Sequence, residues 1–444
     1  MRWGSLLTLA LALALADSTA AAPPGLQGFI RVSNGSFVDE QCHEYLPFGW
    51  NRQETPWSTP WTVWVNLNEE AANAASSLTD GESALDPSVQ NNVVSLFQEA
   101  NTCGFNVIRL FALGQDVNHQ LQLAPGRYNE SYFRGIDFLL AVAGMHSVKA
   151  IVNTLDNWLD PEVGGGKNQY LAWAGIDPEY EDTFWTSKKV RDMIKDHYTV
   201  LVNRRNVFTG KLYKDDDTIL AWDIYNEPRC PASQIGTGCP SAITAFYRDL
   251  SAYMKHVDPN HLVTTGEEGF FELSSGEADA DPSGIPENVL SAGRYWSAKI
   301  GQDFQAQCDL PSIDYCTIHM WPDNWESTDP MFPHTWIEAH EAVSAAMGKP
   351  LVLEEFGKGK GKNVTYAAVY DTLQDSSLHN GSFKGVLFWR WGQDSVEGGG
   401  TDFNIVQTGD PTFQLILNAS AHIKPFLGRS VPGCNPKPPV TAFG

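Results

Sequence analysis

Positive charge is scarce in this 444-residue chain, which has 30 Lys and Arg against 53 Asp and Glu and a formal net charge of −23. A chain this acidic lacks the basic surface that a nucleic-acid backbone or an anionic membrane requires, so neither partner is expected. Beyond the first residues it also lacks an apolar run long enough to cross a membrane. Repeats, long linkers and low-complexity tails are absent too, which predicts one domain of catalytic size.

The first residues are typical of a secretory signal. An apolar run over residues 6–16 is too short to span a bilayer, and Ala-Ala-Pro-Pro at 21–24 then breaks any helix. We therefore expect a soluble protein that enters the secretory route and is extracellular or vacuolar, and of these we choose secreted and extracellular. The predicted segments are a signal peptide over 1–20, a catalytic domain over 25–430 and a short Pro-rich tail over 431–444. Glycosylation in a eukaryotic host is predicted from five Asn-x-Ser/Thr sequons, at Asn34, Asn129, Asn363, Asn380 and Asn418.

The seven cysteines do not have metal-ligand spacing, because no pair is Cys-x-x-Cys. Two pairs each bracket a short loop, Cys230 with Cys239 and Cys308 with Cys316. We predict a local disulfide for each pair, in agreement with an oxidising compartment. For Cys42, Cys103 and Cys434 three pairings or three free thiols stay open, and a bond between Cys42 and Cys434 would tie the two ends of the chain together.

Eight short apolar segments have the composition of buried strands. Ile-Val at 151–152 and Leu-Val-Leu at 351–353 do not alternate with polar residues, which is typical of a parallel sheet covered on both faces. Helical patterns lie between the segments, among them one that begins near Asp86 and others over 184–202 and 242–256. This alternation predicts an α/β fold, a single-domain (β/α)8 TIM barrel. The expected strands are 46–51, 106–111, 149–153, 219–227, 262–267, 313–319, 351–355 and 385–389.

Polar side chains stand at the carboxyl ends of these predicted strands. They are Asn51, Arg109, Asn153, Asn226, Glu227, Glu267, His319 and Glu355, with Trp389 on the last strand. A core strand has no packing reason to end on a polar group, and in this fold the carboxyl ends form the rim that carries active sites. Any single one could be a satisfied rim group, but together they favour a cleft with chemistry.

Two motifs place a carboxylate at a strand end, Asn-Glu-Pro at 226–228 and Glu-Glu-Phe-Gly at 354–357. Paired carboxylates can cleave a glycosidic bond, since one protonates the leaving oxygen while the other attacks the anomeric carbon or activates water. Because side chains alternate along a strand, only one of Glu354 and Glu355 is expected to face the barrel axis. We choose Glu355, which is nearer the rim, and assign Glu354 a structural place.

With these motifs the chain resembles glycoside hydrolase family 5, and within it the endo-β-1,4-mannanases. The segments that carry the resemblance are Asp156-Asn157-Trp158, 208–216, Trp222–Cys230, 267–270, 301–304, 318–322 and 354–357. The resemblance implies a secreted monomeric enzyme that hydrolyses internal bonds of a polysaccharide, β-mannan, galactomannan or glucomannan. It implies no cofactor and no metal.

The resemblance also implies roles. Glu227 resembles the acid/base and Glu355 the nucleophile of a retaining double displacement, with carboxyls about 5–5.5 Å apart. Arg109 matches an arginine that keeps the nucleophile ionised, Asn226 an amide that binds the substituent at sugar C2, and His319 a histidine near the acid/base.

Several aromatic and polar residues match substrate contacts of the family. Trp389 resembles the indole floor of the cleavage site, and Trp158, Asn157 and Arg229 resemble further substrate contacts. One departure is Trp321, which stands where the family commonly has a tyrosine bonded to the nucleophile. An indole donates one hydrogen bond and accepts none, so the bond is either kept by Nε1 or lost.

Two alternatives stay open. A β-1,4-glucanase of the same family would show the same motifs, because mannose differs from glucose only at C2. A non-catalytic carbohydrate-binding barrel would share the aromatic cleft, although binding alone does not need paired carboxylates. Of the 15 Trp, several fall in predicted loops where their rings could stack on sugars, namely Trp57, Trp61, Trp64, Trp158, Trp173 and Trp325. Trp222 and Trp336 are expected in the core.

Overall fold

The computed structural model describes residues 28–51, 87–113, 120–158, 166–230, 238–272, 300–359, 361–392, 406–407 and 409–436. The predicted signal peptide, the end of the predicted tail, Asp86, Trp57, Trp61 and Trp64 lie outside these residues.

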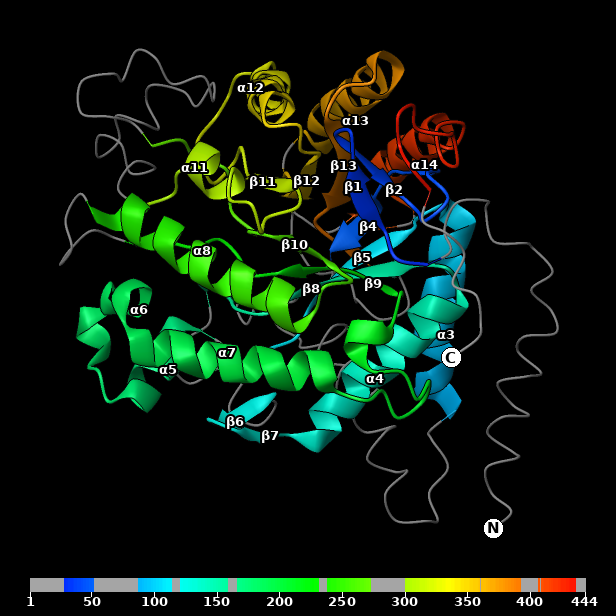
Figure 1. Cartoon of the computed structure of the whole chain (residues 1–444). Helices are drawn as coiled ribbons and strands as arrows, with labels where there is room; N and C mark the ends of the chain where they lie inside the picture. Colours follow the sequence, from blue (N-terminus) through cyan, green and yellow to red (C-terminus); the bar gives the residue numbers. More distant parts are fainter. Residues whose placement is uncertain are drawn as a thin grey trace, which may run out of the picture.

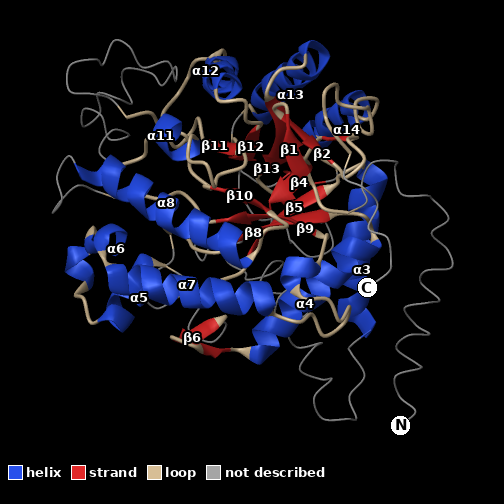
Figure 2. Ribbon diagram, viewed as in Figure 1, coloured by secondary structure: helices blue, strands red, loops and turns tan. Residues whose placement is uncertain are grey.

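A parallel eight-stranded sheet with the order β10-β9-β8-β5-β4-β13-β12-β11 forms the centre of the molecule. The first of these strands, β4, pairs in parallel with the last, β13, so the sheet curls on itself, and helices surround it (Figures 1 and 2). This arrangement confirms the predicted (β/α)8 TIM barrel. Its strands are β4 (Phe48–Asn51), β5 (Val107–Phe111), β8 (Lys149–Asn153), β9 (Ile219–Asp223), β10 (Leu262–Thr264), β11 (Cys316–Met320), β12 (Leu351–Phe356) and β13 (Phe383–Phe388).

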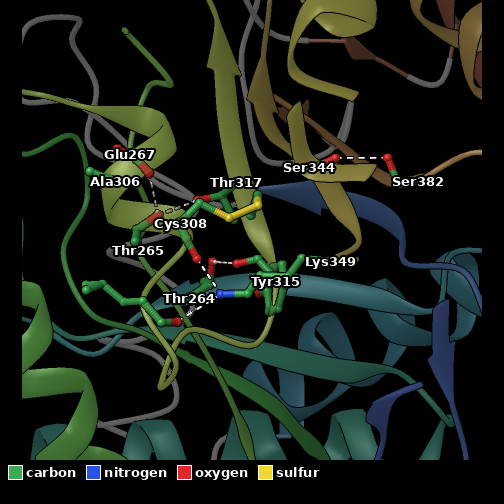
Figure 3. The surroundings of a disulfide bond; sticks show 12 residues. Thr264, Thr265, Glu267, Ala306, Cys308, Tyr315, Thr317, Ser344, Lys349 and Ser382 are labelled. Atoms are coloured by element: carbon green, nitrogen blue, oxygen red, sulfur yellow. Dashed lines mark hydrogen bonds between the residues drawn. A yellow bond between two sulfur atoms is a disulfide. The ribbon is translucent and has the colours of Figure 1, made fainter. Parts of the chain in front are cut away.

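The barrel closes between β10 and β11 without a regular ladder among the described residues. Side chains take the place of some backbone pairs there: the Thr264 hydroxyl donates to the Tyr315 carbonyl (3.0 Å), and the Gly266 N–H donates to the Thr317 hydroxyl (3.0 Å). Figure 3 shows these threonines beside the disulfide of Cys308. Hydrogen bonds of this kind satisfy the strand edges, which would otherwise carry unpaired polar groups.

Helices cover the outside of the sheet. They are α3 (Pro87–Cys103), α4 (Glu130–Met145), α5 (Lys167–Ala174), α6 (Thr183–Thr186), α7 (Lys188–Asn203), α8 (Cys239–Val257), α11 (Phe304–Cys308), α12 (Phe332–Ala346), α13 (Lys362–His379) and α14 (Pro411–Ile423). The helix predicted over 184–202 is divided, because Ser187 is extended (ψ 115°) and its hydroxyl caps α7 by accepting from the Val190 N–H (3.3 Å). Within the described part of the chain no helix has both the length and the apolar character needed to cross a membrane.

Short elements complete the fold. They are the strands β1 (Arg31–Ser33), β2 (Ser36–Val38), β3 (Glu44–Tyr45), β6 (Gln122–Ala124), β7 (Arg127–Tyr128), β14 (Trp391–Gly392) and β15 (Val406–Gln407), with 3-10 turns at Pro178–Tyr180 and Tyr213–Asp215. Phe37 and Tyr45 of the small β1–β3 sheet are fully buried against the inward residues of the barrel, such as Val107, Ala221 and Val352. This apolar plug fills the amino-terminal end of the barrel, so polar groups are left to the carboxyl end.

Alternation along each strand explains which polar groups point inward. Residues two apart lie on the same face of a strand. Val107, Ala221 and Val352 are inward residues of the plug. Two positions after them stand Arg109, Asp223 and Glu354, respectively. A charged layer therefore stacks directly above the plug.

Both predicted local disulfides are present, Cys230 with Cys239 and Cys308 with Cys316. Of the alternatives left open, the structure forms Cys42–Cys434 and leaves Cys103 as the free thiol. The Glu44 N–H also donates to the Arg429 carbonyl (2.7 Å), and in Figure 1 the blue β1–β2 hairpin lies near the red α14. The beginning and the end of the described chain are thus held side by side.

Candidate active site

Glu227 lies just beyond β9, which ends four residues earlier than predicted. Residues 224–227 continue the strand direction by bonding to neighbouring loops: the Asn226 N–H donates to Leu155 O (2.7 Å) and the Glu227 N–H to Gly266 O (2.8 Å). Glu227 has φ of 48°, a left-handed conformation that costs a non-glycine residue on the order of 1 kcal/mol. Strain of this kind is common where a side chain is held for function, and here it turns the carboxyl into the barrel mouth.

Glu354 and Glu355 both reach the same guanidinium, contrary to the expectation that only one would face the axis. Arg109 Nε lies 3.6 Å from Glu354 Oε2, and Arg109 Nη1 donates to Glu355 Oε2 (2.9 Å). The cause is a register shift of β12 against both neighbouring strands, at Ile318/His319 and at Leu353/Phe356. Strict alternation places Glu354 inward, and the irregularity brings Glu355 inward as well.

Glu227 and Glu355 face each other across the mouth of the barrel, and each is 5 % exposed. One carboxylate oxygen of each, with a ring nitrogen of His319, lies within 4.8 Å of the others. His319 Nδ1 is 2.8 Å from Glu227 Oε1, and the Trp158 indole N–H donates to the other oxygen of Glu227. Two carboxyls, an imidazole and an indole thus converge on one point.

Glu355 is bound by two N–H donors. Besides Arg109, the Trp321 Nε1–H donates to Glu355 Oε1 (3.1 Å), so the indole keeps the contact that the tyrosine of the family makes. The Trp321 ring packs on Gly357, where an added Cβ would lie 2.6 Å from Cζ3, and edge-to-face against Trp389 (5.9 Å between centroids). The missing side chain at Gly357 therefore leaves room for the donor to reach the carboxylate.

Arg109 is the centre of the charged layer and is fully buried. Its Nε and Nη2 donate to Asp223 Oδ2 (3.0 and 2.6 Å), Nη2 also donates to Asn226 Oδ1 (2.8 Å), and Nη1 donates to Asn51 Oδ1 (3.3 Å) as well as to Glu355. Burial alone lowers the pKa of Arg109, but the charges of neighbouring carboxylates, Asp223 foremost, outweigh it and raise the pKa. The guanidinium stays charged and fixes Asn226 and Glu355 relative to each other.

Burial shifts the ionisation of the whole site. It raises the pKa of Glu227, and it raises that of Glu355 well above its ordinary value, with a further contribution from the charge of Glu227. Burial, with the positive charge of Arg109, lowers the pKa of His319 to about 3, so the imidazole is neutral. Two buried carboxyls this close do not both ionise at low cost, so the pair favours a state with one shared proton.

The outer predicted residues form a wall beside Glu227. Trp158 is 55 % exposed, and the Arg229 guanidinium stacks on its ring (4.5 Å to the centroid). Arg229 also makes a two-bond pair with Glu268 (3.1 and 2.5 Å), and the Asn157 N–H donates to Asn226 O (3.1 Å). The pair with Glu268 fixes Arg229 against the indole that holds Glu227.

Some predicted residues do not join the site. Glu267 turns away toward the Thr265 hydroxyl (3.1 Å), and its neighbour Glu268 faces the wall instead. Trp325 lies in the loop between β11 and α12 as predicted, but it is buried against Phe270 (5.0 Å between centroids), so its ring is not free to stack on a sugar. Trp173 lies on α5 rather than on a loop. The predicted core positions Trp222 and Trp336 are confirmed as buried.

Four residues of the site were not predicted, Asp223, Asp156, Glu268 and Gln302. Asp223 carries a usable signal, because an acid inside the apolar run Ile-Leu-Ala-Trp-Asp needs a buried partner. Asp156 accepts from Asn226 Nδ2 (2.9 Å), and burial raises its pKa to about 6. Gln302 donates to Glu268 Oε2 (3.0 Å), a contact between distant loops that no local pattern indicates.

A buried pair of carboxyls at the carboxyl edge of a (β/α)8 barrel, one of them held by an arginine, defines the class of glycoside hydrolases. The comparisons agree with this class. The family model described as glycoside hydrolase family 5 β-mannosidase-like matches residues 99–279 and 286–412, and the chain belongs to this family.

Curated relatives and solved structures point the same way. Mannan endo-1,4-β-mannosidase 7 of Arabidopsis thaliana is 35 % identical over 325 residues, which cover 69 % of this chain and 70 % of the relative. Mannan endo-1,4-β-mannosidase 1 of Oryza sativa subsp. japonica is 32 % identical over 370 residues, 78 % of this chain and 80 % of the relative. The structure of the endo-1,4-β-mannanase of Rhizomucor miehei superposes with a TM-score of 0.68 at 25 % identity, covering 90 % of this chain and 99 % of that one.

Proposed function

We propose that this protein is a secreted, endo-acting β-1,4-mannanase that cleaves internal bonds of mannan, galactomannan or glucomannan with retention of anomeric configuration. The observation that carries the mechanism is the distance between the carboxyls. Oxygens of Glu227 and Glu355 lie within 4.8 Å of each other, whereas inverting enzymes keep their carboxyls about 6.5–9.5 Å apart to admit a water molecule.

The hydrogen bonds around the pair support assigning the shared proton to Glu227. Glu355 accepts from Arg109 and Trp321, two donors that favour its ionised form. Nδ1 is the ring nitrogen of the neutral His319 that lies near Glu227, and in the tautomer protonated at Nε2 this Nδ1 accepts a hydrogen bond from the protonated Glu227 carboxyl. Glu227 is then the acid and Glu355 the nucleophile.

The reaction follows in two steps. The Glu355 carboxylate attacks the anomeric carbon while Glu227 gives its proton to the leaving glycosidic oxygen, which forms a glycosyl ester on Glu355 and frees the first product. A water molecule then attacks the same carbon, Glu227 takes the proton of that water, and Glu355 leaves as a carboxylate. Asn226, held by Arg109 and Asp156, is placed to bond the substituent at C2 of the sugar.

The substrate and the cellular location of the protein are supported by separate observations. The relatives named above are mannan endo-1,4-β-mannosidases, which favours β-mannan over glucan at the cleavage site. Secretion is supported by the signal-like first twenty residues and by three disulfides, which persist in oxidising compartments. Amino-terminal sequencing of protein recovered from the culture medium tests the proposed secretion. We expect the mature chain to start near residue 21.

Hydrolysis of galactomannan, glucomannan and cellulose side by side tests the substrate. We expect mannan cleavage to be fastest, and faster cleavage of cellulose would overturn the substrate assignment. Glu227→Gln and Glu355→Gln should each lower kcat by at least about 10³-fold, because each removes one of the two carboxyls of the mechanism. Glu338→Gln, an exposed glutamate on α12, is the matched control and should retain full activity.

Two further measurements test retention and the nucleophile. NMR of the first product should show the β-anomer before mutarotation, and an initial α-anomer would exclude the double displacement. A 2-fluoro-mannosyl inactivator should form an ester on Glu355, and an ester on another residue would refute its assignment.

A further inference from the structure

Glu354 is a fully buried carboxyl that the reaction as described does not use. It lies on β12, two positions after Val352 of the apolar plug and directly below Glu355. Neither of its oxygens has a hydrogen bond of normal geometry within the described structure. A carboxyl in this position at the base of a reactive pair calls for an explanation.

Among the groups that affect the pKa of Glu354, Arg109 is the only cation. The N–H groups of Arg109 already donate hydrogen bonds to other residues. A guanidinium has five N–H groups. Those of Arg109 serve Asp223 twice, and Asn226, Glu355 and Asn51 once each. The remaining approach, Nε to Glu354 Oε2 at 3.6 Å, is too long for a hydrogen bond.

The charges around Glu354 also oppose its ionisation. Asp223 on β9 and Glu355 on β12 already surround the one positive charge of Arg109 on β5. The remaining titratable neighbour is Tyr315, next to β11, whose hydroxyl is near enough to lower the pKa of Glu354, although it makes no hydrogen bond of normal geometry in the described part of the chain. A third carboxylate here would be buried with the Tyr315 hydroxyl as its one remaining donor and without a well-formed hydrogen bond, which is costly. Burial accordingly raises the pKa of Glu354 to about 8.

We propose that Glu354 is a positioning residue that is held as a neutral carboxylic acid below Arg109, and that its neutrality leaves the guanidinium directed at Glu355. When Glu354 loses its proton at alkaline pH, its charge competes with Glu355 for Arg109. The proposal rests on the proposed function for its catalytic consequence, but the protonation of Glu354 is a property of the folded chain and is testable without substrate.

The first test compares thermal unfolding of the wild type and Glu354→Gln from pH 4.5 to pH 8. The pKa of Glu354 rises from 4.5 to about 8 on folding, so the wild type loses stability as pH rises through this window, whereas glutamine does not titrate. The midpoint temperature of E354Q minus that of the wild type should therefore increase with pH. An ionised, ion-paired Glu354 gives the opposite result, with E354Q less stable at pH 7 and the gap closing in acid, and that result would overturn the proposal.

Asp223→Asn is the matched control, because Asp223 takes two hydrogen bonds from the same guanidinium. It should lower the midpoint at pH 7, as expected for an ion-paired carboxylate. If E354Q does not fold, Glu354→Met supplies a second neutral side chain of similar length, and failure of both to fold would also refute a neutral Glu354. Infrared difference spectra at pH 6 should show one protonated carboxyl more in the wild type than in E354Q, because the protonated Glu227 contributes to both, and equal carboxyl intensity would count against the proposal.

The catalytic consequence is tested by kcat on a soluble mannan oligosaccharide across pH. E354Q should match the wild type within twofold at pH 6 and exceed it above pH 8, with KM unchanged, since the effect acts on Glu355 and not on binding. Coincident profiles would remove the positioning role. If the wild type cleaves no mannan at all, the proposed function fails while the melting curves still decide the state of Glu354.

Discussion

Replacing Trp321 with phenylalanine removes one hydrogen bond from Glu355 and little else. The aromatic ring can still rest on Gly357 and against Trp389, but the Nε1–H that lies 3.1 Å from Glu355 Oε1 is lost. Arg109 remains as the other donor. The variant therefore removes the indole N–H, which lowers the pKa of Glu355 and also that of Glu227.

The size of the effect follows from the charge of the acceptor. A hydrogen bond to a charged group contributes about 1.5–3 kcal/mol, and about 1.4 kcal/mol corresponds to one pH unit, so Trp321→Phe should raise the pKa of Glu355 by about 1 to 2 pH units. The nucleophile must be ionised to attack. The acidic limb of kcat/KM should consequently move to higher pH by the same amount, so that activity is lost first in acid.

The assay is kcat/KM on a soluble mannan oligosaccharide from pH 3 to pH 8, with Trp321→Tyr as the rescue variant. Tyrosine restores a donor and should return the acidic limb toward the wild-type position. An acidic limb that stays in place in the phenylalanine variant would show that the Nε1 bond does not hold the nucleophile ionised. Equal loss of kcat/KM at every pH would instead indicate a packing effect and contradict the role assigned to the Trp321 Nε1–H.

Three other predictions rest on different parts of the molecule. Gly357→Ala should shift the acidic limb of kcat/KM as Trp321→Phe does, because its Cβ would lie 2.6 Å from Cζ3 of Trp321 and displace the indole. Replacing Cys42 and Cys434 together by serine should lower the free energy of unfolding in urea by about 2–5 kcal/mol, and an unchanged value would show that the bond does not restrain the unfolded chain. Burial lowers the pKa of His197 to about 3, so the wild type should lose stability as pH falls from about 6.5, by up to about 1.4 kcal/mol per pH unit, and urea unfolding of His197→Gln should lack this loss.

The fold was largely predictable because its strands are covered on both faces. Apolar runs without alternation located all eight barrel strands, and β8 matched its predicted bounds of 149–153. Prediction was weaker where side-chain hydrogen bonds or strand register determine where an extended segment ends and which way its residues point. The extension of residues 224–227 beyond β9 depends on hydrogen bonds to loops after neighbouring strands, which lie far away in sequence.

The site was predictable where a local motif carries the residue and was not where a bulge or a distant partner does. Glu227 and Glu355 stand in short motifs at strand ends, whereas the inward turn of both Glu354 and Glu355 results from a register shift that alternation cannot reveal. The contact of Trp321 with Glu355 was an open question in sequence, because it depends on the space that Gly357 leaves for the ring.

The Cys42–Cys434 bond makes the backbone between these two residues a covalently closed ring. A single proteolytic cut in any loop inside the ring opens the backbone but releases no fragment, because the disulfide keeps the two parts of the cleaved chain in one molecule. Such a nicked protein migrates at full mass until the disulfide is reduced. The bond between the two ends would thereby hold the wall of the barrel together after the first cut.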